Sequence, residues 1–326
     1  MIKKVSFEGW DNCVEMVSGD FRIIITTDVG PRVIGGFLGD SKNIFNVDPA
    51  LAGKTGGKEW VNYGGHRLWH SPETRERTYE PDNSMIQVIE LEDGGLSFIS
   101  NPEEKSGIAK TINIYPVGEH SFRVEHYMRN VGVWPIELAA WGISVMAPGG
   151  VAVVPHNTAQ KGLTPSKFIS VWPYTKMNDP RIDWGEKLVM VRQDASDDAK
   201  PMKIGLNCEE GWIAYLNQGV AFIKQFDHFV DESYPDNGCS VEVYTCKEML
   251  ESETLSPLYT LDPGDEIIHI EEWTLLPTGD AEFKNEQDVI DFLQIDFDDE
   301  HDCCCGDDDC CCGDDDDNCS CGCHDK

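Results

Sequence analysis

Short runs of β-branched and aromatic residues, separated by Gly, Asn, Asp and Pro, make up most of the first 280 residues. Such runs are typical of β-strands, and breaks such as Asp93-Gly94-Gly95 are typical of hairpin turns. The pattern predicts strands over residues 21–27, 32–38, 85–91, 96–100, 109–115, 121–129, 136–146, 150–154, 168–171, 187–191, 211–216, 220–226, 240–245, 258–261 and 266–276. Helical patterns do not separate these strands. An all-β fold, a large antiparallel sandwich or barrel, is therefore favoured over a parallel α/β sheet.

One clear helix is predicted, from Asn285 to Leu293, because Val289, Ile290 and Leu293 share a face behind a polar first turn. The stretch 48–83 is rich in glycine and polar residues, as a functional loop region would be. We expect a β-sandwich domain over residues 1–280, a short helix and linker over 281–295, and a tail over 296–326.

The tail holds nine of the thirteen cysteines and thirteen acidic residues, so it cannot build an apolar core, and we expect disorder without metal. Its thiols and the imidazole of His324 suit a soft or borderline ion such as Zn(II), Cu(I), Ni(II) or Cd(II). The candidate ligands are Cys303, Cys304, Cys305, Cys310, Cys311, Cys312, Cys319, Cys321, Cys323 and His324. The spacing is not that of a zinc ribbon, so an acidic extension with incidental metal uptake remains an alternative.

Charge narrows the choice of partners. The tail carries about -12 of the formal net charge of -33, which leaves about -21 on the rest of the chain. An acidic surface repels phosphate backbones and anionic lipids, so we expect no nucleic-acid or membrane partner and a neutral or cationic ligand. The sequence shows no apolar stretch of signal-peptide or membrane-spanning length, and we expect the protein in the cytoplasm. The other four cysteines lack ligand spacing and are expected to be buried or incidental thiols.

The densest polar cluster lies between Tyr63 and Glu73. In it, two histidines, His66 and His70, can exchange protons near neutral pH, and Arg67 can hold an oxygen-bearing substrate. Trp69 offers a flat face for a pyranose ring. If the segment is extended, the two histidines share one face while Arg67 and Trp69 share the other. The alternatives are a loop tied down by polar residues or a zinc site, and the glycines and proline here disfavour the helix that His-x-x-x-His ligation needs.

A second cluster lies late in the chain. Alternation places Glu242 and Tyr244 opposite the neighbouring valines, and Glu251 on the same face as Glu253. Burial would raise the pKa of such a carboxyl group unless a cation holds it ionised, and either state suits acid-base chemistry. A structural ion pair is the alternative for each glutamate.

A resemblance connects these clusters. The stretches 21–34, 64–73, 141–150, 241–245, 250–257, 261–266 and 272–273, in this order, resemble an uncharacterised domain family of the DUF4380 type within the galactose-mutarotase-like superfamily. The resemblance covers roughly residues 5 to 278. It implies a β-supersandwich with a carbohydrate site on its larger sheet and no cofactor for the sandwich.

Aldose 1-epimerases of this superfamily use a late Glu as base, two His residues, and an Arg and an Asp that contact the sugar. By resemblance, Glu242 would be the base with His66 or His70 as its acid partner, and the substrate contacts would be Arg67, Trp69, Glu73, Trp141 and Glu253. The mid-chain position of the second epimerase His holds Trp141-Gly142-Ile143, and the Asp has no match. Two functions therefore stay open: an aldose 1-epimerase, or a non-catalytic carbohydrate-binding protein whose tail binds or buffers soft metal ions.

Overall fold

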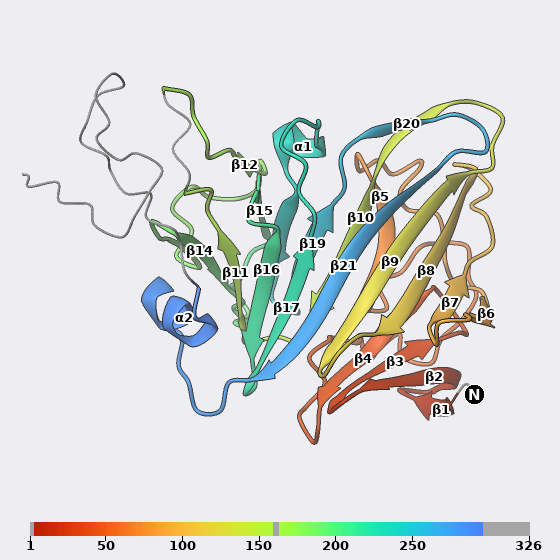
Figure 1. Ribbon diagram of the computed structural model, residues 1–326, viewed down its shortest axis with the longest axis horizontal. Helices are drawn as coiled ribbons and strands as arrows, with labels where there is room; N and C mark the ends of the chain where they lie inside the picture. Colours follow the sequence, from red (N-terminus) through yellow and green to blue (C-terminus); the bar gives the residue numbers. More distant parts are fainter. Residues whose placement is uncertain (1–2, 159–162, 296–326) are drawn as a thin grey trace, which may run out of the picture. The chain divides into compact units, whose positions relative to one another are not determined.

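A computed structural model describes residues 3–158 and 163–295, which form two antiparallel sheets (Figure 1). The 11-stranded sheet has the order β1 (Lys3–Phe7), β2 (Trp10–Ser18), β3 (Phe21–Thr26), β4 (Arg32–Leu38), β5 (Gly65–Ser71), β10 (Ile136–Met146), β19 (Leu250–Leu255), β18 (Val241–Thr245), β15 (Met202–Leu206) and β12 (Ile169–Val171), with β20 (Tyr259–Leu261) paired to β10. The 10-stranded sheet has the order β13 (Ile182–Trp184), β14 (Leu188–Arg192), β11 (Val151–Pro155), β16 (Trp212–Asn217), β17 (Val220–Phe226), β21 (Glu266–Pro277), β9 (Ser121–Asn130), β8 (Ile108–Pro116), β7 (Leu96–Ile99) and β6 (Gln87–Glu90).

The inner faces of the two sheets share one hydrophobic core. Phe21 of the first sheet meets Phe122 of the second with ring centroids 5.0 Å apart, and both side chains are fully buried. The order of strands does not follow the order of the sequence: β21, near the end of the chain, lies between β17 and β9 (Figure 1). Residues that form a site on either sheet therefore come from distant segments. The predicted all-β antiparallel sandwich is confirmed.

Several strands escape the sequence pattern. The pattern does not predict β1, β2, β13, β15 or β19, because their runs are short or interrupted by charged and polar residues. In β15 the run Met202-Lys203-Ile204-Gly205-Leu206 contains a lysine and a glycine, yet all of it is buried. Pairing with β18 on one side and β12 on the other fixes β15 as a strand despite its composition.

The expected loop region 48–83 contains a buried strand, β5, with irregular segments on both sides. Gly64 and Gly65 precede its polar residues with φ of +90° and +69°, and a Cβ at Gly65 would collide with the carbonyl oxygen of Val33. Glycine is therefore required for this backbone path. As a result β5 pairs with β4 at Val33 and His66, and then runs along β10 from Gly65 to Ser71.

Two helices occur among the described residues, α1 (Pro235–Gly238) and α2 (Glu286–Leu293). α2 matches the predicted helix, and Asn285 caps it in a capping box. Glu286 accepts backbone hydrogen bonds from the start of β14, so the helix packs beside that strand. Neither of these helices has the length and apolar character needed to cross a membrane. The cysteine-rich tail and its predicted metal ligands lie outside the described residues.

Candidate functional site

A cavity of about 500 Å³ opens on the outer face of the 11-stranded sheet, over β5, β10, β19, β18 and β15. We call it the aromatic pocket. Its lining consists of Trp60, Asn62, Arg67, Trp69, Glu73, Tyr79, Trp141, Ile143, Tyr174, Lys200, Pro201, Lys203, Tyr244, Met249 and Glu251. This volume lies within the range of roughly 300–1,000 Å³ that is usual for small-molecule sites.

Aromatic side chains form one wall of the pocket. The ring centroid of Trp69 lies 4.7 Å from that of Trp60, 4.8 Å from Tyr79 and 5.7 Å from Trp141. Trp69 and Trp141 stand side by side because β5 and β10 pair these two residues directly. Four rings from separate segments therefore make one wall, and the sheet register holds two of them in place.

Arg67 lies against this wall. Its guanidinium carbon is 4.4 Å from the centre of the Trp69 ring, and Nη2 donates to Glu251 Oε1 at 3.1 Å. Arg67 is only 3% exposed, and its Nε and Nη1 groups find no acceptor among the residues that the structure describes. The indole Nε1 of Trp60 is likewise buried without an acceptor in that part of the chain. Buried donors are normally satisfied, so these three groups are candidate donors for hydrogen bonds to a ligand.

Lys203 also lines the pocket, and it covers two buried glutamates. Its Nζ lies 2.6 Å from Glu242 and 2.9 Å from Glu253, both fully buried. The indole of Trp141 donates to Glu253 at 2.8 Å, and the Lys203 ammonium lies 4.5 Å from the centre of that ring. The two glutamates are direct neighbours because the register pairs Glu242 of β18 with Glu253 of β19.

Burial sets the protonation of this cluster. Burial raises the pKa of Glu242 well above its usual value and also raises the pKa of Glu253. The Lys203 ammonium stabilises both carboxylates and so opposes these shifts, but the effect of burial is larger. Burial would lower the pKa of Lys203, but the attraction of the two carboxylates raises it well above the usual value. One ammonium therefore faces two carboxyl groups whose raised pKa values favour the protonated form, which reduces the negative charge of the cluster.

The two histidines predicted to be catalytic do not line the aromatic pocket. His66 and His70 point to the opposite face of β5 from Arg67 and Trp69, and both are fully buried between the sheets. The predicted alternation along β5 is confirmed, whereas the expected meeting of a histidine with the substrate-binding residues is not found. Arg67, Trp69, Glu73 and Trp141 do come together in the pocket. Glu242 and Glu253 lie beneath it, covered by Lys203.

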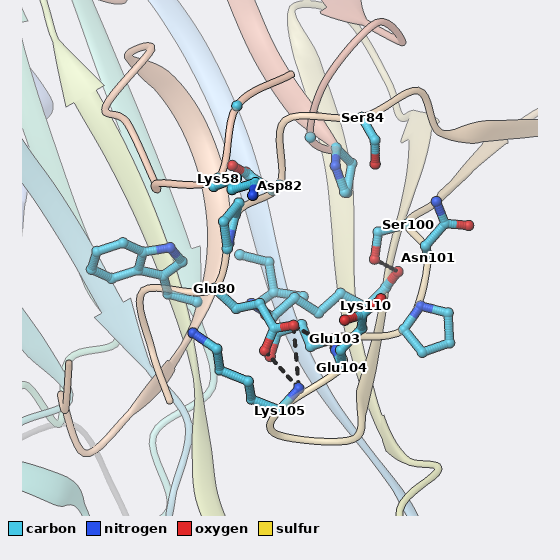
Figure 2. A pocket seen from close by; sticks show the side chains of 17 residues that line it. Lys58, Glu80, Asp82, Ser84, Ser100, Asn101, Glu103, Glu104, Lys105 and Lys110 are labelled. Atoms are coloured by element: carbon cyan, nitrogen blue, oxygen red, sulfur yellow. Dashed lines mark hydrogen bonds and ion pairs between the residues drawn. The ribbon is translucent and has the colours of Figure 1, made fainter. Parts of the chain in front are cut away.

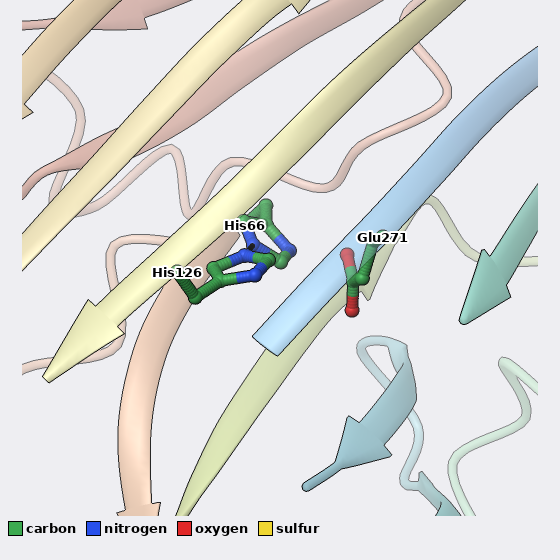
Figure 3. A group of neighbouring side chains, drawn as sticks. All are labelled: His66, His126 and Glu271. Carbon is green, nitrogen blue, oxygen red and sulfur yellow. Dashed lines mark hydrogen bonds between the residues drawn. The ribbon is translucent and has the colours of Figure 1, made fainter. Parts of the chain in front are cut away.

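His66 belongs to a polar cluster inside the sandwich, with His126 and Glu271 (Figure 3). Their ligand atoms lie within 4.8 Å of one another, so a metal site has to be considered. The hydrogen bonds indicate another arrangement. His126 Nδ1 donates to the His269 carbonyl at 3.0 Å, which leaves His126 Nε2 to accept from His66 Nε2 at 2.7 Å. His66 Nδ1 then accepts from the hydroxyl of Ser144 at 2.9 Å.

Glu271 likewise has protein partners for its carboxylate oxygens. It forms an ion pair with Lys224 at 2.8 Å and accepts hydrogen bonds from Trp273 at 2.6 Å and from Thr254. Burial lowers the pKa of His66 and His126, so both rings are neutral, as this chain of hydrogen bonds requires. The cluster is satisfied by protein groups alone, and a divalent cation would be repelled by the adjacent ammonium. We interpret it as a polar part of the core.

Sequence reasoning missed several pocket residues. Lys203 lies in a strand that the pattern does not predict, and Trp60 and Tyr79 lie in irregular segments. Glu251 could have been predicted as a pocket residue, because alternation already places it on the same strand face as Glu253. The available signal for Lys203 was a single charged residue between apolar neighbours, which is unusual in a buried strand.

No protein-family model matches the sequence, and no curated protein matches it. Solved structures do match in fold. A galactose mutarotase-like protein of Lactobacillus casei has a TM-score of 0.54 at 11% identity, and the match covers 81% of this chain and 100% of that protein. A candidate aldose 1-epimerase of Klebsiella pneumoniae has a TM-score of 0.55 at 12% identity, and the match covers 90% of this chain and 85% of that one.

A candidate mutarotase of Salmonella typhimurium has a TM-score of 0.55 at 10% identity, and the match covers 85% of this chain and 94% of that protein. At these identities the likeness shows the fold alone. The fold is mutarotase-like, as the sequence resemblance implied. The narrower assignment to the DUF4380-type family stays a prediction.

Proposed function

We propose that this protein binds a carbohydrate in the aromatic pocket. The main support is Arg67, which is 3% exposed and leaves Nε and Nη1 without an acceptor among the described residues. A buried donor without a partner costs about 1–3 kcal/mol. A ligand that brings oxygen atoms to Arg67 and to Trp60 Nε1 would remove that cost on binding.

The rest of the lining suits the two kinds of surface that a pyranose presents. Its C–H face packs on aromatic rings, and Trp60, Trp69, Tyr79 and Trp141 offer them. Its hydroxyl groups both donate and accept, and the carboxylates of Glu73 and Glu251 are acceptors in the same lining. The mutarotase-like fold supports a sugar as the ligand.

The charges in the pocket favour a neutral sugar. Arg67 is paired with Glu251, and Lys203 is balanced by the glutamates beneath it. Of the remaining charged side chains in the lining, Lys200 and Glu73 have opposite signs. A sugar carrying a phosphate or carboxylate would have to compete with these carboxylates for the cations.

A second candidate function is aldose 1-epimerase activity, favoured by the ionisable groups that reach the pocket. In this proposal Glu251 takes the proton of the anomeric hydroxyl, and the Lys203 ammonium protonates the ring oxygen as the C1–O5 bond breaks and C1=O forms. Rotation and ring closure by the reverse proton transfers give the other anomer. Glu242, the base expected from the resemblance, would hold the Lys203 ammonium in place through their ion pair rather than touch the sugar.

The test of binding is isothermal titration calorimetry with a panel of neutral aldoses, using wild type and Arg67→Met. Arg22→Met is the matched control, because Arg22 also lies over an aromatic ring, Phe37, at 4.1 Å and pairs with a glutamate, outside the pocket. We expect binding to weaken at least tenfold in Arg67→Met and to be unchanged in Arg22→Met. Equal affinity in the two variants, with both folded, would contradict the proposal.

Turnover is tested separately by exchange NMR on the anomers of every sugar that binds. Acceleration by wild type that is lost in Glu251→Gln, with binding retained, would support the epimerase. Binding without acceleration would leave a carbohydrate-binding protein.

Two further proposals come from composition alone. We propose that the tail, residues 296–326, binds a soft metal ion through its nine thiols and His324, and that the protein is cytoplasmic. A metal-binding tail would be independent of the sugar site. Subcellular fractionation checks the location, and the metal experiment is given in the Discussion.

A further inference from the structure

A second cavity of about 450 Å³ lies where β4 and β5 separate. These strands pair at Val33 and His66. The cavity is bounded on one side by Gly30 and Pro31, which come just before β4, and on the other by Leu68 and Trp69 of β5. Segments 57–58, 80–84 and 100–105 complete the walls. Figure 2 shows the polar side chains that these segments contribute.

The second cavity adjoins the aromatic pocket at Trp69, a residue that lines both. Two chain segments also contribute to both cavities. In the first segment, Trp60 lines the aromatic pocket and Lys58 lines the second cavity. In the other segment, Tyr79 lines the aromatic pocket and Glu80 lines the second cavity. The two cavities are therefore neighbours with a common wall, and a ligand seated on Trp69 lies next to both.

The carboxylates of the second cavity are held in place by the protein. Arg32 donates to both oxygens of Asp82 at 3.1 Å, and the backbone nitrogen of Lys105 donates to Glu80 at 3.0 Å (Figure 2). Each of these two carboxylates is thus a fixed acceptor, and the charge of Asp82 is compensated by Arg32.

Glu103 is the deepest of these groups. It pairs with Lys110, and its other oxygen lies 3.4 Å from Nε2 of the buried His70. Burial would raise the pKa of Glu103, but Lys110 and His70 lower it to about 2, so it stays ionised. Burial lowers the pKa of His70, which favours the neutral ring beside Glu103. This contact gives His70 a place in the structure away from the aromatic pocket.

The lining thus combines fixed acceptors with hydroxyl, amide and ammonium donors, supplied by Ser84, Asn101, Lys58 and Lys105. Trp69 is the single large aromatic side chain among the described residues of this lining. Such a surface suits a hydroxyl-rich, uncharged group more than an apolar or strongly charged one. A single hexose in the aromatic pocket would leave this cavity unused.

We propose that the second cavity is a subsite for a further sugar unit, so that the ligand is a disaccharide or longer glycan that crosses Trp69. This inference rests on the proposed carbohydrate binding in the aromatic pocket. One unit occupies the aromatic pocket, and the next is held by the fixed carboxylates and donors of the second cavity.

The experiment compares calorimetric affinities for glucose, galactose and mannose with those for maltose, cellobiose and lactose, in wild type and Ser84→Trp. Ser84 is an exposed residue of the second cavity and does not line the aromatic pocket, so a tryptophan there blocks one subsite. Ser233→Trp is the matched control, because Ser233 is exposed and lines neither cavity.

We expect at least one disaccharide to bind tenfold or more tightly than its component monosaccharides. Ser84→Trp should abolish this advantage and leave monosaccharide affinity unchanged, and Ser233→Trp should change neither. Monosaccharide binding with no gain for any disaccharide, or a gain that survives Ser84→Trp, would overturn the subsite and leave the aromatic pocket intact. Absence of binding by every sugar would overturn the proposed function itself.

Discussion

The buried ion pair between Lys224 and Glu271 provides the sharpest test of the interior. Lys224 Nζ donates to Glu271 at 2.8 Å and to the carbonyl oxygens of Gly142 at 3.1 Å and Ser252 at 3.2 Å. Both charged side chains have zero exposure. The lysine therefore joins β17 to β21 of its own sheet and to β10 and β19 of the opposite sheet.

Lys224→Met keeps most of the side-chain volume and removes the charge. Glu271 then stays buried without its counter-ion, and two carbonyl groups lose their donor. Removal of one partner of a buried ion pair costs about 3–5 kcal/mol. We expect a loss of this size in the free energy of unfolding at pH 7. The double variant Lys224→Met/Glu271→Gln should recover part of it, because the uncompensated charge is gone.

The pH dependence adds a second signature. Burial lowers the pKa of His66, His126 and His269, the last to about 3, and repulsion by Lys224 contributes to each shift. Below about pH 6.5 the unfolded chain binds protons that the folded wild type does not, so these groups cost stability as pH falls. Without Lys224, one histidine near Glu271 can accept a proton in the folded state. The difference between wild type and Lys224→Met should therefore narrow by up to about 1.4 kcal/mol per pH unit between pH 6.5 and 5.

Guanidinium unfolding at several pH values, followed by near-UV circular dichroism, measures both effects. A loss below about 1 kcal/mol at pH 7 would refute the buried ion pair, since the expected cost is several times larger. A difference that stays constant from about pH 6.5 to 5 would refute the coupling between Lys224 and the histidines.

Three further results are expected. Glu242→Gln should gain stability relative to wild type as pH rises from about 4.5 to 8, by up to about 1.4 kcal/mol per pH unit. The reason is that burial raises the pKa of Glu242, so the folded protein keeps a proton that the unfolded chain releases. A stability difference that stays constant over this pH range would contradict the prediction. Gly205→Ala should lower the free energy of unfolding by about 1–3 kcal/mol, measured by thermal or chemical unfolding, because the added Cβ would lie 2.5 Å from Cys239 Sγ. If that contact is the cause, adding Cys239→Ala should restore most of the lost stability. Deletion of 296–326 should remove most thiol-dependent zinc or Cu(I) binding in an elemental assay, because the remaining four cysteines are buried and burial raises the pKa of Cys239 to about 12; unchanged metal stoichiometry would contradict a metal-binding tail.

The sequence predicted the fold class and part of the pocket. Two-residue alternation correctly separates Arg67 and Trp69 from His66 and His70, because a strand can place only alternate side chains on one face. The resemblance nevertheless suggested a histidine as the acid partner of Glu242. The positions of the two histidines in the structure agree with the alternation and not with the role that the resemblance implied.

The parts of the site that the sequence did not predict depend on pairings between distant segments. Lys203 meets Glu242 and Glu253 because β15, β18 and β19 are neighbours in the sheet, and sequence periodicity carries no information on that order. The same holds for the interior cluster, in which His66 and His126 come from different sheets. The prediction that the four cysteines before the tail are buried is confirmed, since it needs only the residue type and its apolar neighbours.

The most direct test of the central proposal is a crystal structure of the protein with the tightest-binding sugar of the panel. The account predicts a pyranose in the aromatic pocket, packed on Trp69 or Trp141, with its oxygen atoms within hydrogen-bond distance of Arg67 Nε or Nη1. A sugar that binds in solution but lies elsewhere in the crystal, with Arg67 Nε and Nη1 not bound to it, would contradict the proposal.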